Sequence, residues 1–276
     1  MIKNLIKSFR VIGFFFTAIS NRLRLTSIDK KSPFKGTISN KGYLTLSLSE
    51  NSIKHLNEKI KLEDVSKNVR LNLQDKNLIF EIFSKLKDPI DDYLGNEVYL
   101  DGIEWIRTTS DNPKNKTNIS TKWHVDNVGN RLKCFVCVFG DGTQPTVVVP
   151  TEKPVPSFLK WLQITFIESL RWIGFNSNFK IKNQEFLYHK SGSINIFDTQ
   201  LLHRGDYEEG NQERLILELE FSKKEKHNLT NGPIGTTKTN SFLCNLNLIE
   251  LDDFKKFIDY DRLVKIDDNY FKYEKN

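Results

Sequence analysis

The spacing of apolar residues differs from one part of the chain to another, and it predicts where helices and strands lie. Residues 43–49, Tyr-Leu-Thr-Leu-Ser-Leu-Ser, alternate between the two kinds of side chain, which is typical of a strand with one buried face. In residues 76–87 the apolar side chains recur at helical spacing, so we predict a helix with a broad apolar face. The first third of the chain therefore mixes helix and strand.

Short strand-like runs follow one another from residue 97 onward. They are rich in β-branched and aromatic residues, and Gly, Asn, Asp and Pro stand between them. Eight such runs favour a β-sandwich or a jelly roll. The predicted strands are 98–100, 104–109, 132–139, 146–149, 185–188, 193–197, 201–203 and 214–221.

One predicted helix, 157–175, interrupts this series of strands. It is too apolar for a helix with one solvent-exposed face, so we expect it to be buried against a sheet. The alternative is a lid or a membrane-touching element beside a functional site. No repeat and no linker rich in Pro, Gly or Ser divides the chain. We expect one structural domain, with segment 1–96 packing on a core over 97–222 and an extension over 223–276.

Composition and charge exclude several classes of protein. The chain has 276 residues, of which 38% are hydrophobic and 28% are charged with both signs, so it is expected to be globular. The net charge of +6 comes from 41 basic and 35 acidic residues that are spread along the chain. A nucleic-acid partner is therefore not expected, because such partners require a concentrated basic surface.

The cysteines predict packing and not metal binding or disulfides. Three cysteines in a chain of this length argue against a disulfide framework and favour a reducing compartment, the cytoplasm. Cys134 and Cys137 form a Cys-x-x-Cys within the predicted strand 132–139. Positions three apart on a strand point to opposite faces, so these thiols cannot chelate one metal ion.

The N-terminal apolar run 11–19 is flanked by Lys and Arg residues. It is too short to span a bilayer, and no clear small-x-small cleavage site follows it. We expect a helix packed on the domain, and a helix at a membrane surface is the alternative.

Candidate chemistry is concentrated in His124, Asp126 and His203. In an extended segment residues i and i+2 project from the same face, so His124 and Asp126 can turn an imidazole and a carboxylate toward one point. His203 ends a short predicted strand far downstream. Two imidazoles and one carboxylate form the facial triad that suits non-haem Fe(II) and leaves positions open for a co-substrate and O2.

Arg214 opens the last predicted strand, 214–221. An Arg at the mouth of a barrel strand can hold a carboxylate by two parallel hydrogen bonds, whereas a Lys offers only a point charge. Together with the triad, this residue points to 2-oxoglutarate as the co-substrate.

The motif His124-x-Asp126, followed by His203 and Arg214 with strands around them, resembles the Fe(II)/2-oxoglutarate-dependent oxygenases. It is most similar to the phytanoyl-CoA dioxygenase branch, in which an acidic turn with Gly leads to a Val-Val-Pro strand, as in residues 141–150 here. The resemblance covers about residues 97–222. It implies an α+β, β-rich fold with a double-stranded β-helix (jelly-roll or cupin-like) core and flanking helices.

The resemblance also implies an activity. An enzyme of this kind uses Fe(II), 2-oxoglutarate and O2 to hydroxylate an aliphatic C–H of a small-molecule or lipid-like substrate, and it releases succinate and CO2. Asp126 argues against the halogenases of the family, which have a small residue there. Arg214 argues against the collagen-type prolyl hydroxylases, which carry a Lys, and Glu220 stands where nucleic-acid demethylases carry a second Arg.

The sequence departs from the family pattern at one position expected to bind 2-oxoglutarate. Many relatives have a Ser or Thr two residues after the Arg, and this chain has Ile216. Arg107, Thr109 and Lys133 are candidates for the second contact by their location, although each also fits an ordinary barrel or surface role. Two other functions stay open: a cupin-like metalloenzyme that does not use 2-oxoglutarate, and a non-catalytic jelly-roll binding module with a vestigial triad.

Overall fold

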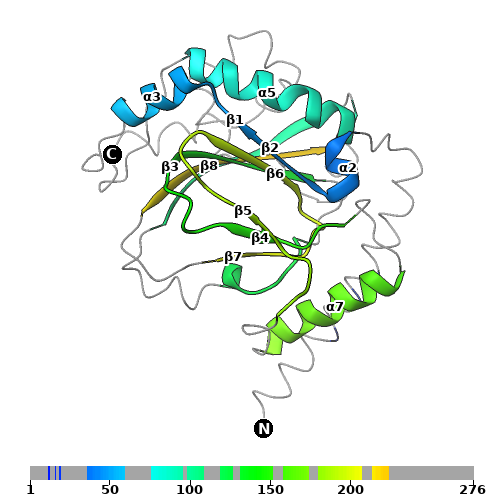
Figure 1. Cartoon of the computed structure of the whole chain (residues 1–276). Helices are drawn as coiled ribbons and strands as arrows, with labels where there is room; N and C mark the ends of the chain where they lie inside the picture. The colour runs from blue at the N-terminus through cyan, green and yellow to red at the C-terminus, as the bar shows by residue number, and fades with distance from the viewer. Residues whose placement is uncertain are drawn as a thin grey trace, which may run out of the picture.

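A computed structural model of the chain describes most of the region between residues 36 and 223. Within it, helices cover one face of a large antiparallel sheet, and a smaller antiparallel sheet lies opposite its other face (Figure 1). The described residues are 12, 16, 19, 36–59, 76–95, 98–108, 119–126, 131–151, 158–173, 180–206 and 213–223.

Two antiparallel sheets form the core of the protein. The large sheet has the strand order β1-β6-β3-β8-β2, and the small sheet has the order β5-β4-β7. The strands of the large sheet are β1 (Tyr43–Ser47), β2 (Val98–Thr108), β3 (Arg131–Phe139), β6 (Ser193–Asp198) and β8 (Arg214–Lys223). Those of the small sheet are β4 (Thr146–Val148), β5 (Glu185–Leu187) and β7 (His203–Gly205).

The strand order is that of a jelly roll. The chain passes between the sheets after β3, β5, β6 and β7, and an isolated bridge from His124 to His203 adds a fourth position to the small sheet beside β7. This bridge, the three small-sheet strands and β2, β8, β3 and β6 make eight positions in two sheets, as a double-stranded β-helix requires. The predicted α+β, β-rich fold is confirmed. β1, from the predicted segment 1–96, pairs with β6 and so extends the sheet.

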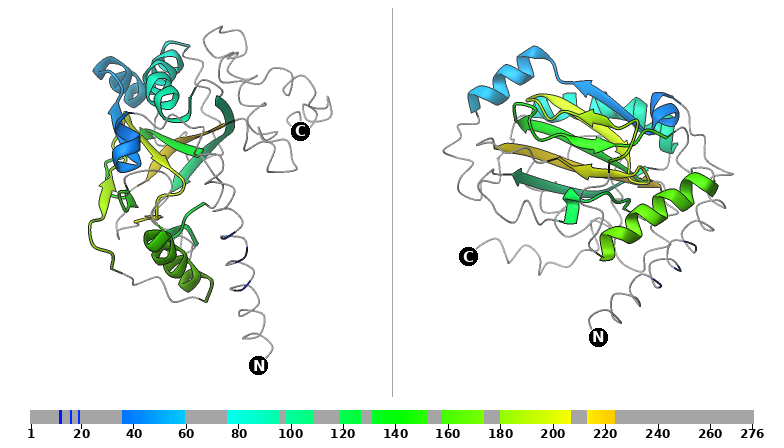
Figure 2. Two further views of the ribbon diagram at one scale, coloured as in Figure 1. Left: turned by 90° about the vertical axis from the view of Figure 1, so that its right-hand side faces the viewer. Right: turned by 60° about the horizontal axis from the view of Figure 1, so that its bottom comes forward.

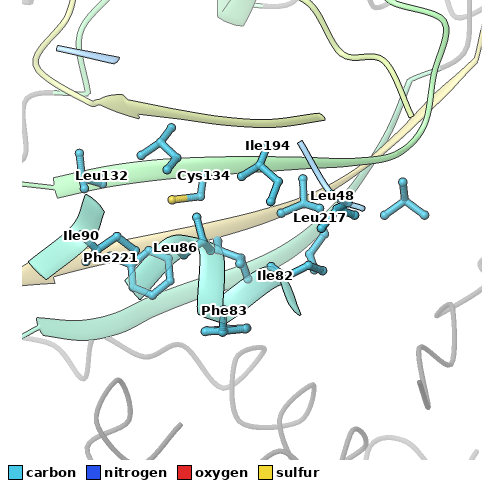
Figure 3. Packing of buried hydrophobic residues seen from close by; sticks show 14 of the residues in the cluster. Leu48, Ile82, Phe83, Leu86, Ile90, Leu132, Cys134, Ile194, Leu217 and Phe221 are labelled. Carbon is cyan, nitrogen blue, oxygen red and sulfur yellow. The ribbon is translucent and has the colours of Figure 1, made fainter. Parts of the chain in front are cut away.

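The helices on the large sheet bury the main hydrophobic core. α5 (Lys76–Leu94) covers the sheet, and the short α2 (Thr37–Lys41) and α3 (Glu50–Lys59) flank it (Figures 1 and 2). Figure 3 shows Ile82, Phe83 and Leu86 of α5 against strand side chains such as Cys134 and Phe221. Each fully buried side chain of this size stabilises the fold by roughly 1.5–3 kcal/mol. The predicted helix 76–87 continues to Leu94 and contains Pro89.

Each strand of the large sheet presents its alternate residues to two different environments. Leu132, Cys134 and Val136 of β3 belong to the core under the helices. Lys133 and Phe135 lie on the opposite face, which we call the interior face because it looks toward the small sheet. Cys134 and Cys137 are both free and buried, and they lie on opposite faces of β3, as predicted.

α7 (Phe158–Ile173) packs on the outer face of the small sheet. Ile164 and Ile167 join Val147 and Val149 of the β4 region in a second hydrophobic cluster. The other side of α7 is exposed, with Leu159 at 78% and Phe166 at 57% exposure. The prediction that helix 157–175 is buried is thus right for one side and wrong for the other, because its apolar residues lie on both sides.

Several predicted segments differ in their limits. The strands 98–100 and 104–109 form the single strand β2, with an irregularity in its pairing between Leu100 and Gly102. The predicted strand 201–203 begins only at His203. Most of the N-terminal run 11–19 and of the extension 223–276 lies outside the described residues.

Ile12, Phe16 and Ile19 of the N-terminal run are described as helical. All three are exposed, so at these positions the expected packing on the domain is not found. In the described ranges no helix has both the length and the apolar character needed to cross a membrane.

Candidate metal centre

His124, Asp126 and His203 meet at the edge of the small sheet. The backbones of His124 and His203 exchange two hydrogen bonds of 2.9 and 2.8 Å, which set the two imidazoles side by side with ring centroids 4.3 Å apart. The backbone N–H of Asp126 donates to the carbonyl of Thr199 at 2.9 Å and fixes the turn after the bridge. The three predicted residues are therefore brought together by main-chain pairing.

The Nε2 atom of each imidazole faces the shared point. Nδ1 of His124 lies 2.6 Å from the carbonyl oxygen of Lys122, and Nδ1 of His203 lies 2.8 Å from that of Leu201. Because a carbonyl only accepts, Nδ1 carries the proton in both rings and Nε2 keeps its lone pair. This is the tautomer that a metal-ligating histidine needs.

The two carboxylate oxygens of Asp126 face different neighbours. Oδ1 lies 3.8 Å from Nε2 of His124 and 3.9 Å from Nε2 of His203. Oδ2 lies 3.0 Å from the ammonium nitrogen of Lys133, on β3. Lys133 thus turns one oxygen of Asp126 away from the histidines and leaves the other facing them.

The donor set fits a single metal ion. One ligand atom from each of the three residues lies within 4.8 Å of the other two, and both histidines are buried. Two neutral imidazoles and one carboxylate suit a first-row divalent ion such as Fe(II). Three protein ligands on one side leave further coordination positions to other molecules.

The electrostatics of the site favour ligation over protonation. Burial, followed by the neighbouring His203, lowers the pKa of His124 to about 3, and burial also lowers the pKa of His203. Burial alone would raise the pKa of Asp126, but His203 and Lys133 outweigh it and hold this pKa below its ordinary value. At neutral pH the site therefore presents two uncharged imidazoles and one carboxylate.

Lys133 is surrounded by acids on the interior face. Besides Asp126, its ammonium nitrogen lies 3.3 Å from a carboxylate oxygen of Glu218 and 3.5 Å from one of Glu220. Glu220 also contacts Arg131. Burial would lower the pKa of Lys133, but Asp126 and Glu218 raise it above its ordinary value. The triad thus stands beside a compact charged cluster.

Arg214 lies at the other end of β8, on the same interior face. It is 8% exposed, its Nε donates to the hydroxyl of Thr108 at 3.3 Å, and its Nη1 donates to the carbonyl of Gln144. These two contacts, from β2 and from the segment before β4, fix the plane of the guanidinium. The predicted Arg is therefore a buried cation inside the barrel.

Sequence reasoning missed a neutral polar group beside Arg214. His189 and Thr146 are both buried, and Nε2 of His189 lies 2.9 Å from the hydroxyl oxygen of Thr146. The amide nitrogen of Asn195 lies 3.3 Å from Nδ1 of His189. Burial, followed by the charge of Arg214, lowers the pKa of His189 well below its ordinary value, so this ring is neutral.

A row of rings connects the two polar groups. The ring of His203 lies 5.1 Å from that of Phe197, which lies 5.3 Å from Phe135, and Phe135 in turn lies 5.6 Å from His189. The triad and the Arg214 group therefore line one interior, with aromatic side chains between them. Aromatic walls of this kind exclude water and strengthen nearby electrostatic interactions.

The remaining predicted co-substrate contacts are placed differently. Arg107 pairs with Leu215 on β8, and Leu215 faces the helices, so the register puts Arg107 on the face away from Arg214. Thr109 lies outside the described residues. Ile216 is buried on the interior face, two residues from Arg214, where it offers no hydrogen bond.

A second group that the sequence did not reveal comes from α7. Glu168 is 1% exposed, and one of its carboxylate oxygens lies 3.6 Å from Nη1 of Arg171. After burial and several nearer groups, the charge of Arg171 also contributes to the lowered pKa of His124 and of His203. Sequence spacing gave no signal for the pair of Glu168 and Arg171, because its burial depends on the packing of α7 on the outer face of the small sheet.

Comparisons with known proteins give partial structural likenesses. The sequence matches no protein-family model and no curated protein. A structure of HygX from Streptomyces hygroscopicus with nickel and 2-oxoglutarate bound is 11% identical, with 68% of this chain and 85% of that chain covered and a TM-score of 0.45.

Two further solved structures have similar values. EctD from S. alaskensis with 2-oxoglutarate and 5-hydroxyectoine is 14% identical, with 68% of this chain and 74% of that chain covered and a TM-score of 0.43. ThoJ, a non-heme monooxygenase, is 8% identical, with coverages of 67% and 75% and a TM-score of 0.44. With such partial superpositions, the chemistry of this site has to be judged by its own residues.

Proposed function

We propose that the protein is an Fe(II)- and 2-oxoglutarate-dependent oxygenase that hydroxylates an aliphatic C–H of a small-molecule or lipid-like substrate in the cytoplasm. The observation that carries this proposal is the combination of His124, Asp126 and His203 with buried Arg214 on one barrel interior. The triad alone would suit many metalloenzymes. A buried guanidinium across an aromatic interior adds a site for the far end of a dicarboxylate.

The residues of the chain have separate tasks in this reaction. His124, Asp126 and His203 would hold the ferrous ion, which with 2-oxoglutarate and O2 supplies the oxidising chemistry that releases succinate and CO2. The backbone carbonyls of Lys122 and Leu201 keep both imidazoles in the ligating tautomer. Phe135 and Phe197 keep water from the interior between the metal and Arg214.

Thr146 is our candidate for the second contact to the distal carboxylate, in the role that Ile216 cannot fill. The amide N–H of Asn195 faces Nδ1 of His189, so the ring proton lies on Nε2 and is donated to the hydroxyl oxygen of Thr146. Thr146 can then donate its own hydroxyl proton to a carboxylate. The contact of Arg214 with the Gln144 carbonyl holds the guanidinium next to this segment.

Lys133 is less suited to that second contact. Its ammonium is engaged by Asp126, Glu218 and Glu220, so a co-substrate would compete with three carboxylates. Its geometry supports another task, which is to hold Oδ2 of Asp126 while Oδ1 faces the histidines. A residue of this kind orients the ligand that it contacts.

An anaerobic titration tests the proposal. Purified protein is loaded with Fe(II) and titrated with 2-oxoglutarate, because the keto acid gives a weak visible charge-transfer band only when it binds the iron. We expect the band in the wild type and in a Lys54→Gln control at an exposed position of α3, and its loss in His203→Ala. Iron uptake without the band would instead favour the cupin-like metalloenzyme. No iron uptake would favour a binding module with a vestigial triad.

A further inference from the structure

Exposed apolar side chains are concentrated on one side of the molecule. Among the described residues ten large apolar side chains are exposed, and six of them come from α7 and from the β5 segment. Figures 1 and 2 show α7 on the side of the molecule opposite α5. We call these six side chains the outer apolar surface, and they are Phe158, Leu159, Leu162, Phe166, Phe186 and Tyr188.

The register of the small sheet places the two parts of this surface on the same side. Val147 lies under α7, in the cluster that contains Ile164 and Ile167. Phe186 is the direct partner of Val147 on the edge strand β5, so its side chain also leaves the outer face of the sheet. The ring of Tyr188, two residues later, stacks on that of Phe186 with centroids 6.1 Å apart. The aromatic pair therefore lies beside the strand on which α7 packs.

The exposed side of α7 is a continuous apolar stripe. Leu159, Leu162 and Phe166 are separated by three and four residues, which is the spacing of one helix face. Their exposed fractions are 78%, 40% and 57%, and the ring of Phe158 stacks on that of Trp161. In a globular protein such a stripe normally packs against another element. Its exposure here indicates a partner outside the chain.

The charges near this surface narrow the class of partner. Three exposed lysines stand just before and after β5: Lys180, Lys182 and Lys190. The acid of β5, Glu185, lies on the opposite face of the sheet. It pairs with Val148, whose side chain belongs to an interior cluster, and its charge acts on Tyr43. The outer apolar surface is thus accompanied by positive charge, which suits an anionic partner.

The N-terminal run has the same combination of properties. Ile12, Phe16 and Ile19 are helical and exposed, and they too have the spacing of one helix face. Residues 1–28 contain no Asp or Glu and five basic residues: Lys3, Lys7, Arg10, Arg22 and Arg24. Apolar side chains among basic residues are typical of helices that lie on a membrane with negative charge.

We infer that the outer apolar surface docks the protein on a membrane that contains anionic lipids. The apolar side chains enter the boundary between headgroups and acyl chains, and the lysines meet the negative headgroups. A second copy of this chain is a poorer partner, because a symmetric dimer through this surface would bring like-charged lysines together. This inference does not depend on the reaction at the candidate metal centre.

Sedimentation of the full chain with lipid vesicles tests the inference. The vesicles contain phosphatidylcholine alone or with about 30% phosphatidylserine, at low and at high salt. One variant, Phe166→Ser, removes an apolar side chain of α7, and its matched control is Phe80→Ser on α5, where the side chain is 50% exposed. A second variant, Lys180→Gln with Lys182→Gln, is matched by Lys54→Gln with Lys87→Gln, at exposed positions of α3 and α5.

We expect vesicles with phosphatidylserine to bind at least about tenfold more tightly than phosphatidylcholine alone, and high salt to reduce the difference. Phe166→Ser and the double Lys180 and Lys182 variant should each weaken binding about fivefold or more. Both controls should stay within about twofold of the wild type. Because all these side chains are exposed, the urea midpoint should not change, which separates lost docking from lost folding.

Several results would overturn the inference. The full chain could fail to bind phosphatidylserine vesicles, or bind both compositions equally. Unchanged binding in Phe166→Ser and in the lysine variant would assign docking to another part of the chain. Sedimentation velocity without vesicles tests the second copy. A dimer that Phe166→Ser dissociates would show that the outer apolar surface is instead an interface between two chains.

Discussion

The two faces of the large sheet are built from the same strands but differ in almost every property. On β8 the residues Leu215, Leu217 and Leu219 join the apolar core under α5, while their neighbours Arg214 and Glu218 face the interior. The helix-facing residues are interchangeable in kind, since each needs only to be apolar and of suitable volume. Arg214 and Glu218 instead each depend on a specific polar partner, Thr108 and Lys133.

This difference separates stability from chemistry within one sheet. Substitutions on the helix-facing side should change the free energy of unfolding and leave the site alone. Those on the interior face should change ligand binding through specific partners. The following variants test whether the two faces are as independent as the alternation of side chains suggests.

The largest effect is expected for Asp126→Ala. Two imidazoles remain and the site loses its one charged ligand, so iron uptake and succinate formation should both fall strongly. Iron content by metal analysis and succinate release measure the two effects. His55→Gln, on α3, is the control. Succinate production equal to the wild type would show that the triad is not the reactive centre.

The substitution Arg214→Gln tests whether Arg214 binds the distal carboxylate of 2-oxoglutarate. Loss of a buried charged partner costs about 2–5 kcal/mol in binding, so the affinity for 2-oxoglutarate should fall by a factor of about 30 or more. Iron binding should persist, because Arg214 is not a ligand. The visible band measures the affinity for 2-oxoglutarate, and metal analysis measures the iron content. The keto acid 2-oxobutyrate, which lacks the distal carboxylate, should bind equally in wild type and variant. An unchanged affinity for 2-oxoglutarate would place the grip elsewhere.

Leu219→Ala is the counterpart on the helix-facing side. Leu219 is fully buried, and removal of such a side chain costs about 2–5 kcal/mol through lost transfer energy and the cavity left behind. Urea unfolding gives the change in the free energy of unfolding. The iron-dependent band of the folded fraction should be unaltered. A changed affinity for iron or 2-oxoglutarate would show that the two faces are coupled.

Much of this division could be predicted from sequence, because it follows from local periodicity. The alternation in residues 214–221 is enough to place Arg214, Glu218 and Glu220 on one face of a strand. The triad was also predictable, since His124 and Asp126 are two residues apart and His203 follows them in the order that the motif requires. The bridge between His124 and His203 shows that the two imidazoles lie side by side, which the sequence alone could not establish.

The features that could not be predicted depend on contacts between segments that are distant in the sequence. Thr146 and His189 are 43 residues apart and meet through the small sheet, so no spacing rule relates them. Arg107 was chosen by its position before the motif, but strand register decides its face, and a shift of one residue reverses the face. Glu168 and Arg171 pair on α7, whose composition predicted burial without saying which side would be buried.

The substitution Lys133→Met tests how much the Lys133 ammonium contributes to the stability of the metal-free protein. The change leaves Asp126 and Glu218 without their shared ammonium. Unpaired buried charges cost about 3–5 kcal/mol, and we expect about 2 kcal/mol here because the Lys133 side chain keeps 18% exposure. Urea unfolding with and without Fe(II) measures the loss. Metal should restore more stability to the variant than to the wild type; an equal gain would contradict this role.

The effect expected from His189 is smallest at neutral pH and grows as the pH falls. Its pKa is lowered by burial in the folded protein, whereas it titrates near 6.5 when unfolded, so below that pH the unfolded chain binds the extra proton first. Stability from this residue is therefore lost as the pH falls from 7 to 5, by up to about 1.4 kcal/mol per pH unit. Urea unfolding of metal-free His189→Gln should show a shallower loss than the wild type or His55→Gln. Parallel profiles would mean that His189 takes up its proton while folded, and that the neutral group beside Arg214 is not neutral.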